Sequence, residues 1–355
     1  MKNKIFIIVF LVYIFGFGIY SIVDTDKEIS YTERRYLDKL PKFELTNKYI
    51  DKLDGYLVDQ FPLRDEYRSI KALYNYNVLN MLVNNNIYIE DGYIFKSNYP
   101  TNISSINNFI KHVYNTTSNM SEDNNVYVML VPDKNYYLDS KDFLQLEYDY
   151  IYSEVSKIDN VKFIDIRDVM ELDDYYETDT HWRQERLGKV VNVLGNEMGF
   201  TYNDVEYDVK EYDKFYGVYY GESAIDRNPE VLKYLTNDVI DNARVEYLEH
   251  KDFNKVYNED KLDGMDAYDV YLDGATPYIE IYNDNSKSDK ELIIFRDSFG
   301  SSITPLLIEY YSKITVIDNR YIHSSFYLEN VEYKDQDVLF LYSTLIANES
   351  FTLKN

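Results

Sequence analysis

The chain contains no cysteine among its 355 residues. This absence excludes thiol catalysis, disulfide bonds, and zinc–thiolate and iron–sulfur sites. Basic residues are also scarce, since 37 Lys and Arg stand against 62 Asp and Glu and leave a formal net charge of -25. A nucleic-acid partner is therefore not expected, because its phosphates require a basic surface. No long polar tract is present, and apolar residues at 45% supply a sizeable core, so the sequence predicts a folded protein.

The longest apolar stretch lies at the N-terminus. Residues 5–23 read IFIIVFLVYIFGFGIYSIV and carry no charge, and at about 1.5 Å per residue they nearly span a hydrocarbon core. A cleavable signal peptide has a shorter apolar run and a small-residue cleavage site, which Ile22-Val23-Asp24 lacks. We therefore predict an uncleaved transmembrane anchor over residues 1–23. A cleaved signal peptide and a buried core helix are the alternatives.

Charges on both sides of this stretch predict its orientation. Lys2 and Lys4 precede it, whereas Asp24 and Asp26 follow it. By the positive-inside rule, the N-terminus lies in the cytoplasm, and the rest of the chain is extracytoplasmic and held at the cell membrane by a single pass. A lipoprotein anchor is excluded because no cysteine follows the stretch.

The chain beyond the anchor divides into a tether and a larger domain. Residues 24–46 are charged and are interpreted as the tether. Residues 47–355 are interpreted as one extracytoplasmic domain, which begins with helical spacing on both sides of a break at Phe61-Pro62. Apolar and aromatic segments then flank Glu90-Asp91-Gly92, and this pattern predicts a β-hairpin.

From about residue 100, helical and strand patterns alternate. Continuous apolar strands separated by helices are typical of a parallel sheet that is covered on both faces. The predicted fold class is therefore α/β, a sandwich with a parallel central sheet. Residues 200–286 interrupt the pattern and are interpreted as an insertion of loops and short strands. The expected strands are residues 126–131, 161–165, 292–295, 314–317 and 338–341.

A serine lies at the carboxyl end of one expected strand. The segment Phe295-Arg296-Asp297-Ser298-Phe299-Gly300 follows residues 292–295 and precedes an apolar helical stretch. In an open α/β sheet, ligands bind at this edge, and a helix start offers N–H groups to an oxyanion. Ser298 is therefore the candidate nucleophile. The competing interpretation is a Ser or Asp that only caps the helix.

A serine nucleophile needs a base, and the chain has four histidines. His112 lies in an amphipathic helical stretch and His250 in a charged segment, so both are interpreted as packed or solvated. His323 follows a strand near the same sheet edge as Ser298 and is the runner-up. The fourth, His181, lies between a strand and a helical stretch and is the preferred base.

His181 has an acidic neighbour two residues earlier, Asp179. In an extended or turning segment, this spacing lets the carboxylate orient the imidazole and stabilise its cation, which leaves the other ring nitrogen for a hydroxyl. A D-x-H pair alone also suits a metal site or a surface loop. No second histidine stands at ligand spacing, however, so no metal is predicted.

The two motifs together resemble a known family. Asp179-Thr180-His181-Trp182, followed far downstream by Asp297-Ser298-Phe299, is similar to the AlgJ/AlgX-like SGNH-hydrolase-like proteins of alginate O-acetylation, and more closely to the bacterial DHHW family. Ordinary SGNH esterases carry the serine block first, whereas this sequence has the permuted order. Thr180 stands where DHHW proteins carry His. Further short blocks extend the resemblance over residues 30–345, namely Glu33-Arg34-Arg35-Tyr36-Leu37, Phe61-Pro62-Leu63-Arg64-Asp65, Asp91-Gly92-Tyr93-Ile94-Phe95, Val131-Pro132-Asp133-Lys134 and Asp318-Asn319-Arg320-Tyr321.

The resemblance implies an SGNH-hydrolase-like three-layer sandwich and an extracytoplasmic O-acetyltransferase without a cofactor. In such an enzyme, Asp179 orients His181, His181 deprotonates Ser298, and Ser298 carries an acetyl group to a hydroxyl of a surface or exported polysaccharide. The backbone N–H groups of Ser298 and of Phe299 or Gly300 hold the oxyanion. A membrane-bound O-acyltransferase (MBOAT) supplies the acyl group.

Four further side chains are candidates for binding the acceptor. Arg296, Arg320 and Tyr321 either line a sugar groove or make ordinary surface pairs. Trp182 either stacks on a sugar ring or packs beside its loop. Two other functions stay open, a carbohydrate acetylesterase with the same triad and a non-catalytic polysaccharide-binding or assembly protein.

Overall fold

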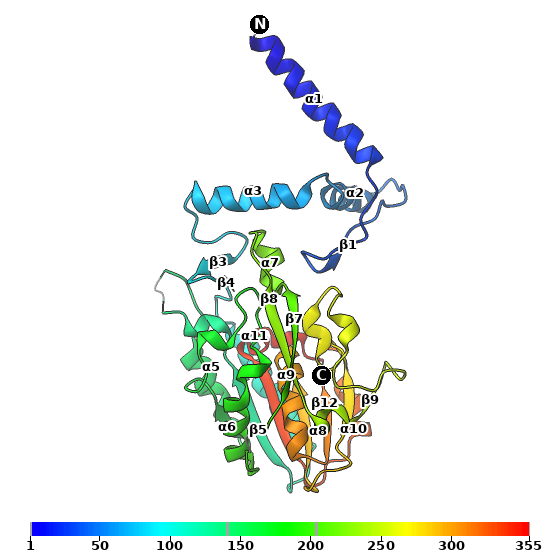
Figure 1. Ribbon diagram of the computed structural model, residues 1–355. Helices are drawn as coiled ribbons and strands as arrows, with labels where there is room; N and C mark the ends of the chain where they lie inside the picture. Colours follow the sequence, from blue (N-terminus) through cyan, green and yellow to red (C-terminus); the bar gives the residue numbers. More distant parts are fainter. Residues whose placement is uncertain (1, 140–141, 203–204, 355) are drawn as a thin grey trace. The chain divides into compact units, whose positions relative to one another are not determined.

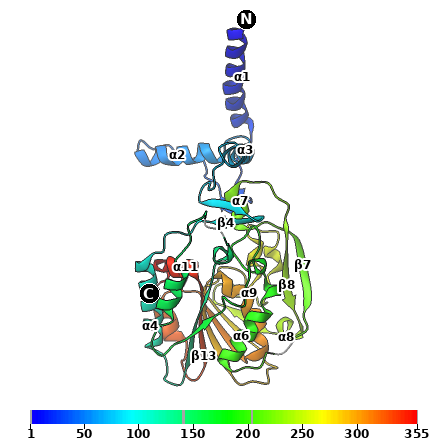
Figure 2. The same cartoon turned by 90° about the vertical axis from the view of Figure 1, so that its left-hand side faces the viewer.

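The computed structural model describes residues 2–139, 142–202 and 205–354. The chain forms two compact units (Figure 1; Figure 2). The N-terminal unit comprises Met1–Tyr88 and Tyr220–Asn228, and the sheet unit comprises Ile89–Tyr219 and Pro229–Asn355. Residue 1 of the predicted anchor and residues 203–204 of the predicted insertion lie outside the described ranges.

The N-terminal unit begins with the apolar helix that the sequence predicts, α1 (Lys2–Val23). Its segment Lys4–Ser21 has a mean hydropathy of 2.1 and is not buried at any point, so by length and composition α1 can cross a membrane. Such a helix fits a membrane anchor and a signal sequence alike. The elements that follow are β1 (Ile29–Ser30), β2 (Arg35–Tyr36), α2 (Asn47–Asp59) and α3 (Arg64–Asn77).

Charged side chains hold the predicted tether against these two helices. Asp59, at the end of α2, accepts from Arg35 at 2.7 Å and from the Asp38 N–H at 2.8 Å. Glu33 accepts from Arg64, the first residue of α3, at 2.6 Å. Residues 33–38 of the tether are therefore packed against the N-terminal unit, which the charge pattern alone did not indicate.

The sheet unit is a mixed α/β structure around a central sheet, as predicted. Within the described residues, this sheet has seven strands in the order β6-β5-β13-β11-β12-β10-β9. The strands from β6 to β12 pair in parallel, whereas β10 is antiparallel to both of its neighbours. The bounds are β5 (Asn125–Val131), β6 (Lys162–Asp165), β9 (Arg244–Tyr247), β10 (Tyr278–Tyr282), β11 (Glu291–Arg296), β12 (Lys313–Ile317) and β13 (Asp337–Ser343).

Alternating side chains of the strands feed two apolar layers, one on each face of the sheet. In β13, Phe340 belongs to the cluster that includes α4 (Ile103–Thr117), α5 (Tyr148–Val155) and α10 (Ser324–Asn330). Its neighbour Leu341 belongs to the cluster that includes α6 (Gly188–Met198) and α9 (Ser298–Leu307). Burial on both faces makes β5, β11, β12 and β13 largely apolar, so these four strands were readable from the sequence. The edge strand β6 is the exception, since its ends Lys162 and Asp165 are exposed.

Residues 200–286, interpreted from the sequence as an insertion, contribute β9 and β10 to the central sheet and a separate antiparallel pair. The pair is β7 (Asp208–Phe215) with β8 (Glu230–Thr236), and α8 (Asp238–Asp241) follows it. The remaining elements are β3 (Ile87–Glu90), β4 (Tyr93–Lys96), α7 (Val218–Ser223) and α11 (Thr344–Asn348).

Candidate active site

Asp297 fixes the turn between β11 and α9. Its backbone is extended, and its Oδ1 accepts the Phe299 N–H at 2.9 Å as the N-cap of α9. Its Oδ2 accepts the N–H and the hydroxyl of Ser343, at the end of β13, at 2.7 and 2.6 Å. Because Asp297 caps the helix, the hydroxyl of Ser298 is available for another contact.

The three predicted triad residues lie in hydrogen-bond contact. Ser298 Oγ is 2.8 Å from His181 Nε2, and Asp179 Oδ1 is 2.6 Å from His181 Nδ1. Asp179 is fully buried and His181 is 8% exposed. A carboxylate only accepts hydrogen bonds, so Nδ1 carries the hydrogen and Nε2 accepts from the serine hydroxyl. This arrangement can activate a hydroxyl as a nucleophile.

Backbone N–H groups of Gly217 and Val218 bind the loop that carries Asp179, residues 177–181, which we call the carboxylate loop. The second oxygen of Asp179 accepts the Val218 N–H at 2.7 Å, and Thr178 Oγ1 accepts the Gly217 N–H at 2.9 Å. A Cβ at Gly217 would lie 2.1 Å from the carbonyl oxygen of Thr178. Only glycine therefore permits this close approach of the two backbones.

Glu230, the first residue of β8, ties the same loop to the β7–β8 pair. Its Oε1 accepts the Glu177 N–H and its Oε2 accepts the Thr178 N–H, each at 2.8 Å. Oε2 also accepts the Thr178 hydroxyl, and Arg183 pairs with Oε1 at 2.9 Å. One nearly buried carboxylate thus orients the backbone just before Asp179.

Aromatic rings enclose the imidazole. The ring of Tyr268 stacks on His181 with centroids 3.9 Å apart and an interplanar angle of 9°, and Phe299 packs at 5.0 Å. The Tyr268 hydroxyl donates to Ser302 Oγ at 2.8 Å, and the Trp182 indole N–H donates to the same oxygen at 2.8 Å. Ser302 therefore links Tyr268, which stacks on His181, and Trp182, which follows His181 in sequence, to α9, the helix that carries Ser298.

Lys134 lies fully buried beneath the carboxylate loop. Its Nζ donates to the carbonyl oxygens of Tyr176 and Glu177 at 2.9 and 3.0 Å. Burial lowers the pKa of Lys134 to about 7, although the negative charges of Asp179 and Glu230 act in the opposite direction. Aromatic rings surround the ammonium group, those of Tyr93, Phe95 and Tyr219.

The helix cap already occupies two of the three predicted oxyanion donors. The Phe299 N–H donates to Asp297 Oδ1 at 2.9 Å, and the Gly300 N–H donates to the Asp297 carbonyl at 3.1 Å. In this structure these two groups do not offer a preformed oxyanion hole. The Ser298 N–H is the remaining candidate of the three.

Two of the four predicted acceptor-binding residues are buried. Arg296 has no exposed surface, pairs with Asp318 at 3.3 Å and donates to the Gly274 carbonyl at 3.2 Å. Trp182 has no exposed surface either and packs on α9. The prediction that these two residues contact a sugar is wrong for this structure, because a fully buried side chain offers no surface to a glycan.

Arg320 and Tyr321 lie at the end of β12 and stay accessible. Ile317, the last residue of this strand, pairs with Phe295 of β11, so both residues belong to the sheet edge that carries Ser298. The side chain of Arg320 is 20% exposed and donates to both oxygens of Asp318, at 2.9 and 2.7 Å. Tyr321 is 46% exposed. They remain the candidates for acceptor binding.

The structure brings His181 to Ser298 and places the other histidines elsewhere. His323, the runner-up, is the N-cap of α10 and accepts the Ser325 N–H at 3.4 Å. His112 is buried with Nε2 3.0 Å from the Asn319 amide, and His250 pairs with Asp273. The described residues contain no group of three or more His, Asp or Glu side chains arranged to hold a metal ion.

Sequence reasoning missed the residues that support the histidine. Glu230, Tyr268 and the turn at Gly217 lie 36 to 87 positions from His181, in the region where no period is visible. Lys134 stands in one of the blocks that carry the family resemblance, but its contact with the loop could not be read there. A local motif cannot report contacts that only the fold creates.

Comparison with known proteins supports the fold. No family model and no curated protein matches the chain. A DHHW family protein from Eubacterium siraeum matches 77% of this chain and 97% of its own, with a TM-score of 0.65 and 21% identity. Bacillus cereus PatB1 matches 76% and 97%, with a TM-score of 0.59 and 17% identity, and its structure with a sulfonyl adduct matches equally well. The O-acetyltransferase domain of Pseudomonas putida AlgJ is a more distant match, covering 74% and 92% with a TM-score of 0.45 and 9% identity. The chain therefore has the fold of the DHHW family protein and of PatB1.

Proposed function

We propose that the protein is an O-acetyltransferase that carries an acetyl group on Ser298 to hydroxyls of an extracytoplasmic polysaccharide. The observation that carries the proposal is the hydrogen-bonded chain from Ser298 Oγ through His181 to the buried carboxylate of Asp179, with contacts of 2.8 and 2.6 Å. The order of the two motifs supports a permuted relative of the SGNH hydrolases.

In the first half-reaction, His181 Nε2 takes the proton of the Ser298 hydroxyl while Oγ bonds to the acyl carbon of the donor. Asp179 stabilises the resulting imidazolium through Nδ1. The negative carbonyl oxygen of the tetrahedral intermediate meets the Ser298 N–H at the start of α9. The bond to the leaving group then breaks, and His181 returns its proton to that group.

In the second half-reaction, a sugar hydroxyl replaces the leaving group. His181 removes its proton, the sugar oxygen bonds to the acetyl carbon, and Ser298 Oγ leaves and regains a proton from His181. Arg320 and Tyr321, at the same sheet edge, are the proposed contacts for the acceptor. No cofactor is needed for either half, since each step exchanges one ester bond for another.

The proposed location is supported by α1, the helix that by length and composition can cross a membrane. We propose that it anchors the chain uncleaved, with residues 24–355 outside the cytoplasm. An acetyl donor must then cross the membrane, and the proposed partner is a membrane-bound O-acyltransferase that exports the acyl group. This partner comes from the family resemblance of the two motifs.

An acyl-transfer assay tests the proposal. The full chain in detergent is given a chromogenic acetyl ester, with and without a neutral oligosaccharide acceptor, and Ser298→Ala serves as the matched control. We expect acetylated sugar with the wild type and none with the variant. Acetate release without acetyl-sugar would instead make the protein an esterase, and no turnover with either would support a binding protein.

A covalent probe tests whether Ser298 is the nucleophile without the need to know the acceptor. A protein of this fold, PatB1, is known with a sulfonyl adduct. Treating the full chain with a sulfonyl fluoride should modify Ser298, because such reagents react with activated hydroxyl groups. Peptide mass spectrometry should locate the adduct on Ser298 in the wild type and find that residue unmodified in His181→Ala.

A further inference from the structure

Helix α3 carries its apolar face on the outside of the N-terminal unit. On the inner side, Ala72 is buried, and Arg68 and Ser69 donate to the carbonyl oxygens of Gly221 and Ala224 at 2.8 and 2.7 Å. The opposite side bears large side chains that we call the α3 apolar face. They follow helical spacing and are Leu63 (48% exposed), Tyr67 (37%), Ile70 (61%), Tyr74 (51%) and Val78 (59%).

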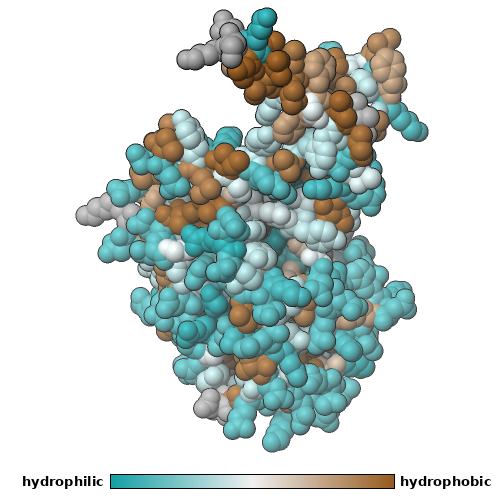
Figure 3. Space-filling model, turned by 45° about the horizontal axis from the view of Figure 1, so that its top comes forward, coloured by the Kyte–Doolittle hydropathy of each residue, from teal (hydrophilic) through white to brown (hydrophobic). Residues whose placement is uncertain are grey.

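This polarity is the reverse of that in a surface helix of a soluble domain, which buries its apolar stripe. Apolar side chains of this size, gathered on one face, indicate a surface that is covered in the functional state. In Figure 3, brown atoms gather on the N-terminal part of the molecule, whereas teal prevails over the sheet unit. The covering partner must therefore be apolar.

The α3 apolar face is continuous with α1. Phe17 stacks on Phe61, just before α3, with centroids 5.9 Å apart, and lies 6.1 Å from the ring of Tyr67. The hydroxyl of Tyr13 is 3.3 Å from that of Tyr67. The face therefore borders the helix that the composition assigns to a membrane, which identifies the covering partner as lipid.

The depth of these contacts agrees with this assignment. Ser21 ends the apolar segment of α1, and at 1.5 Å per residue Phe17 and Tyr13 lie about 6 and 12 Å further into the span. Amphipathic helices at a membrane surface bury their apolar face about 5–10 Å into the boundary between headgroups and acyl chains. The contact of α3 with Phe17 lies in this layer, and the contact with Tyr13 lies just beyond its inner limit.

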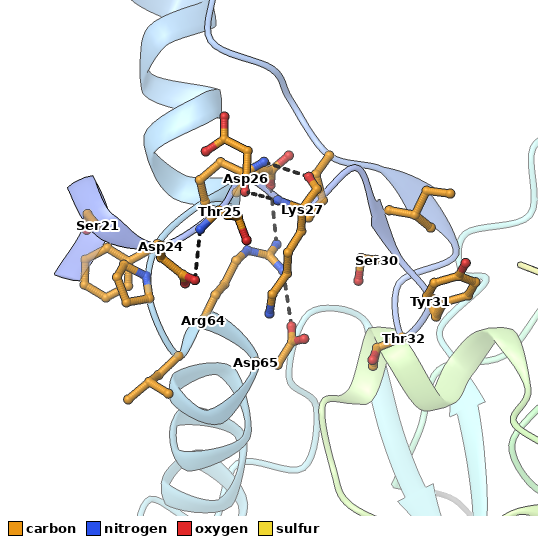
Figure 4. Close-up of a pocket in the computed structure, with 17 residues that line it drawn as sticks. Ser21, Asp24, Thr25, Asp26, Lys27, Ser30, Tyr31, Thr32, Arg64 and Asp65 are labelled. Atoms are coloured by element: carbon orange, nitrogen blue, oxygen red, sulfur yellow. Dashed lines mark hydrogen bonds and ion pairs between the residues drawn. The ribbon is translucent and has the colours of Figure 1, made fainter.

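A polar pocket marks the water side of the same boundary (Figure 4). Its volume is about 260 Å³, and it lies beside the end of α1. Ser21 and Asp24 from that end, and Arg64 and Asp65 from the first turn of α3, line it together. The end of α1 and the start of α3 thus lie beside the same pocket.

We infer that the α3 apolar face lies in the lipid surface of the membrane that α1 crosses. The inference rests on the proposed anchoring role of α1 and is independent of the chemistry at Ser298. The N-terminal unit is then attached to the bilayer at two places, by the membrane span of α1 and by the interfacial helix α3. Two attachments fix its rotation as well as its distance from the bilayer.

Single-cysteine labelling tests this inference, because the natural chain contains no cysteine. The full chain carries an environment-sensitive fluorophore at Ile70→Cys or Tyr74→Cys and is reconstituted into vesicles of phosphatidylcholine and phosphatidylglycerol with brominated acyl chains. Val12→Cys in α1 is the reference for the span, and Lys111→Cys, exposed on α4, is the matched control in water. We expect bromine quenching and blue-shifted emission at 12, 70 and 74, and neither at 111.

Two different results would overturn the inference, and each would have its own meaning. Quenching at position 12 without quenching at 70 and 74 means that α1 is inserted while water, a second copy of the chain or another protein covers the face. No quenching at position 12 means that α1 is not an anchor, and the inference falls with it. Acetyl transfer by the same labelled proteins is measured separately and does not depend on either result.

Discussion

The nucleophile segment and the base segment of the candidate site are held in different ways. Ser298 stands on a strand-to-helix turn whose cap, Asp297, is its direct neighbour in sequence. His181 stands on a loop whose position depends on Glu230, Val218 and Tyr268. The serine is placed mainly by its own turn, with Ser343 as a distant support of Asp297, whereas the histidine is placed by several contacts between distant parts of the chain. The base segment should therefore be the more sensitive to substitutions remote from the chemistry.

The largest effects are expected within the triad itself. His181→Ala removes the base, and we expect kcat/KM for acetyl transfer to fall by about 10²–10⁴-fold or more. Asp179→Asn leaves the shape but not the charge, so a loss of about 10²–10⁴-fold is expected there too. Steady-state assays measure both, and circular dichroism should show an unchanged fold. Activity within about threefold of wild type in either variant would contradict the assignment.

The second prediction concerns a substitution outside the triad that weakens the support of the loop carrying His181. In Glu230→Gln, one carboxylate oxygen becomes an NH₂ group that faces a backbone N–H donor of the loop. We expect kcat to fall by about tenfold and unfolding to cost about 1–3 kcal/mol less. The measurements are turnover and chemical denaturation.

Glu211→Gln is the matched control for Glu230→Gln. Glu211 lies on the partner strand β7, is 56% exposed in its side chain and pairs with Lys233. Loss of such a surface pair changes little. Equal effects of the two substitutions would show that charge on the β7–β8 pair, and not support of the loop, is what matters.

A third prediction separates the ring of Tyr268 from its hydroxyl. Tyr268→Phe keeps the face that stacks on His181 and loses the bond to Ser302, so kcat should stay within about threefold of wild type. Tyr268→Leu loses the stacking face, and a fall of about tenfold is expected. The comparison of kcat for the two variants is the measurement. Equal losses would mean that the hydroxyl does the positioning.

The last prediction concerns stability and not turnover, namely the dependence of the free energy of unfolding on pH. The pKa of Lys134 in the folded chain is lowered to about 7 by burial, whereas an unfolded lysine has a pKa of about 10.4. Between these values the unfolded state binds more protons, so the free energy of unfolding rises with pH. The cost of burying the charge is complete below about pH 7 and declines above it.

Lys134→Met removes this titration and serves to measure it. The free energy of unfolding of wild type minus that of the variant should increase between about pH 7 and pH 9, because the other groups cancel in the difference. Denaturation curves of both proteins at several pH values provide the check. A difference that stays constant with pH would show that Lys134 titrates in its ordinary range.

The features that could be predicted from the sequence are those that depend on neighbouring residues in the chain. Four of the five parallel strands, β5, β11, β12 and β13, were visible because burial on both faces makes them largely apolar. Ser298 was visible because strand, Asp297 and helix stand in one segment, and His181 because Asp179 is two residues away. All of these signals are short in sequence.

The parts that could not be foreseen depend on separation along the chain. β9 and β10 lie at the far edge of the sheet, in a region rich in Tyr and Asp without a clear period. Arg296 looked like a surface cation, but its charge is paired with Asp318, the residue that follows the neighbouring strand β12. A buried ion pair of this kind leaves no pattern in either segment, and the burial of Trp182 against α9 leaves none either.

The most direct measurement is the fate of Ser298 during turnover. The full chain is mixed with an acetyl ester without acceptor, quenched in acid and digested, and the peptide that contains Ser298 is analysed by mass spectrometry. We expect one acetyl group on Ser298 in the wild type, lost on addition of an oligosaccharide acceptor, and no acetylation in His181→Ala. Formation of acetyl-sugar while Ser298 stays unmodified, or an acetyl group on a different residue that turns over, would contradict the assignment of Ser298 as the nucleophile.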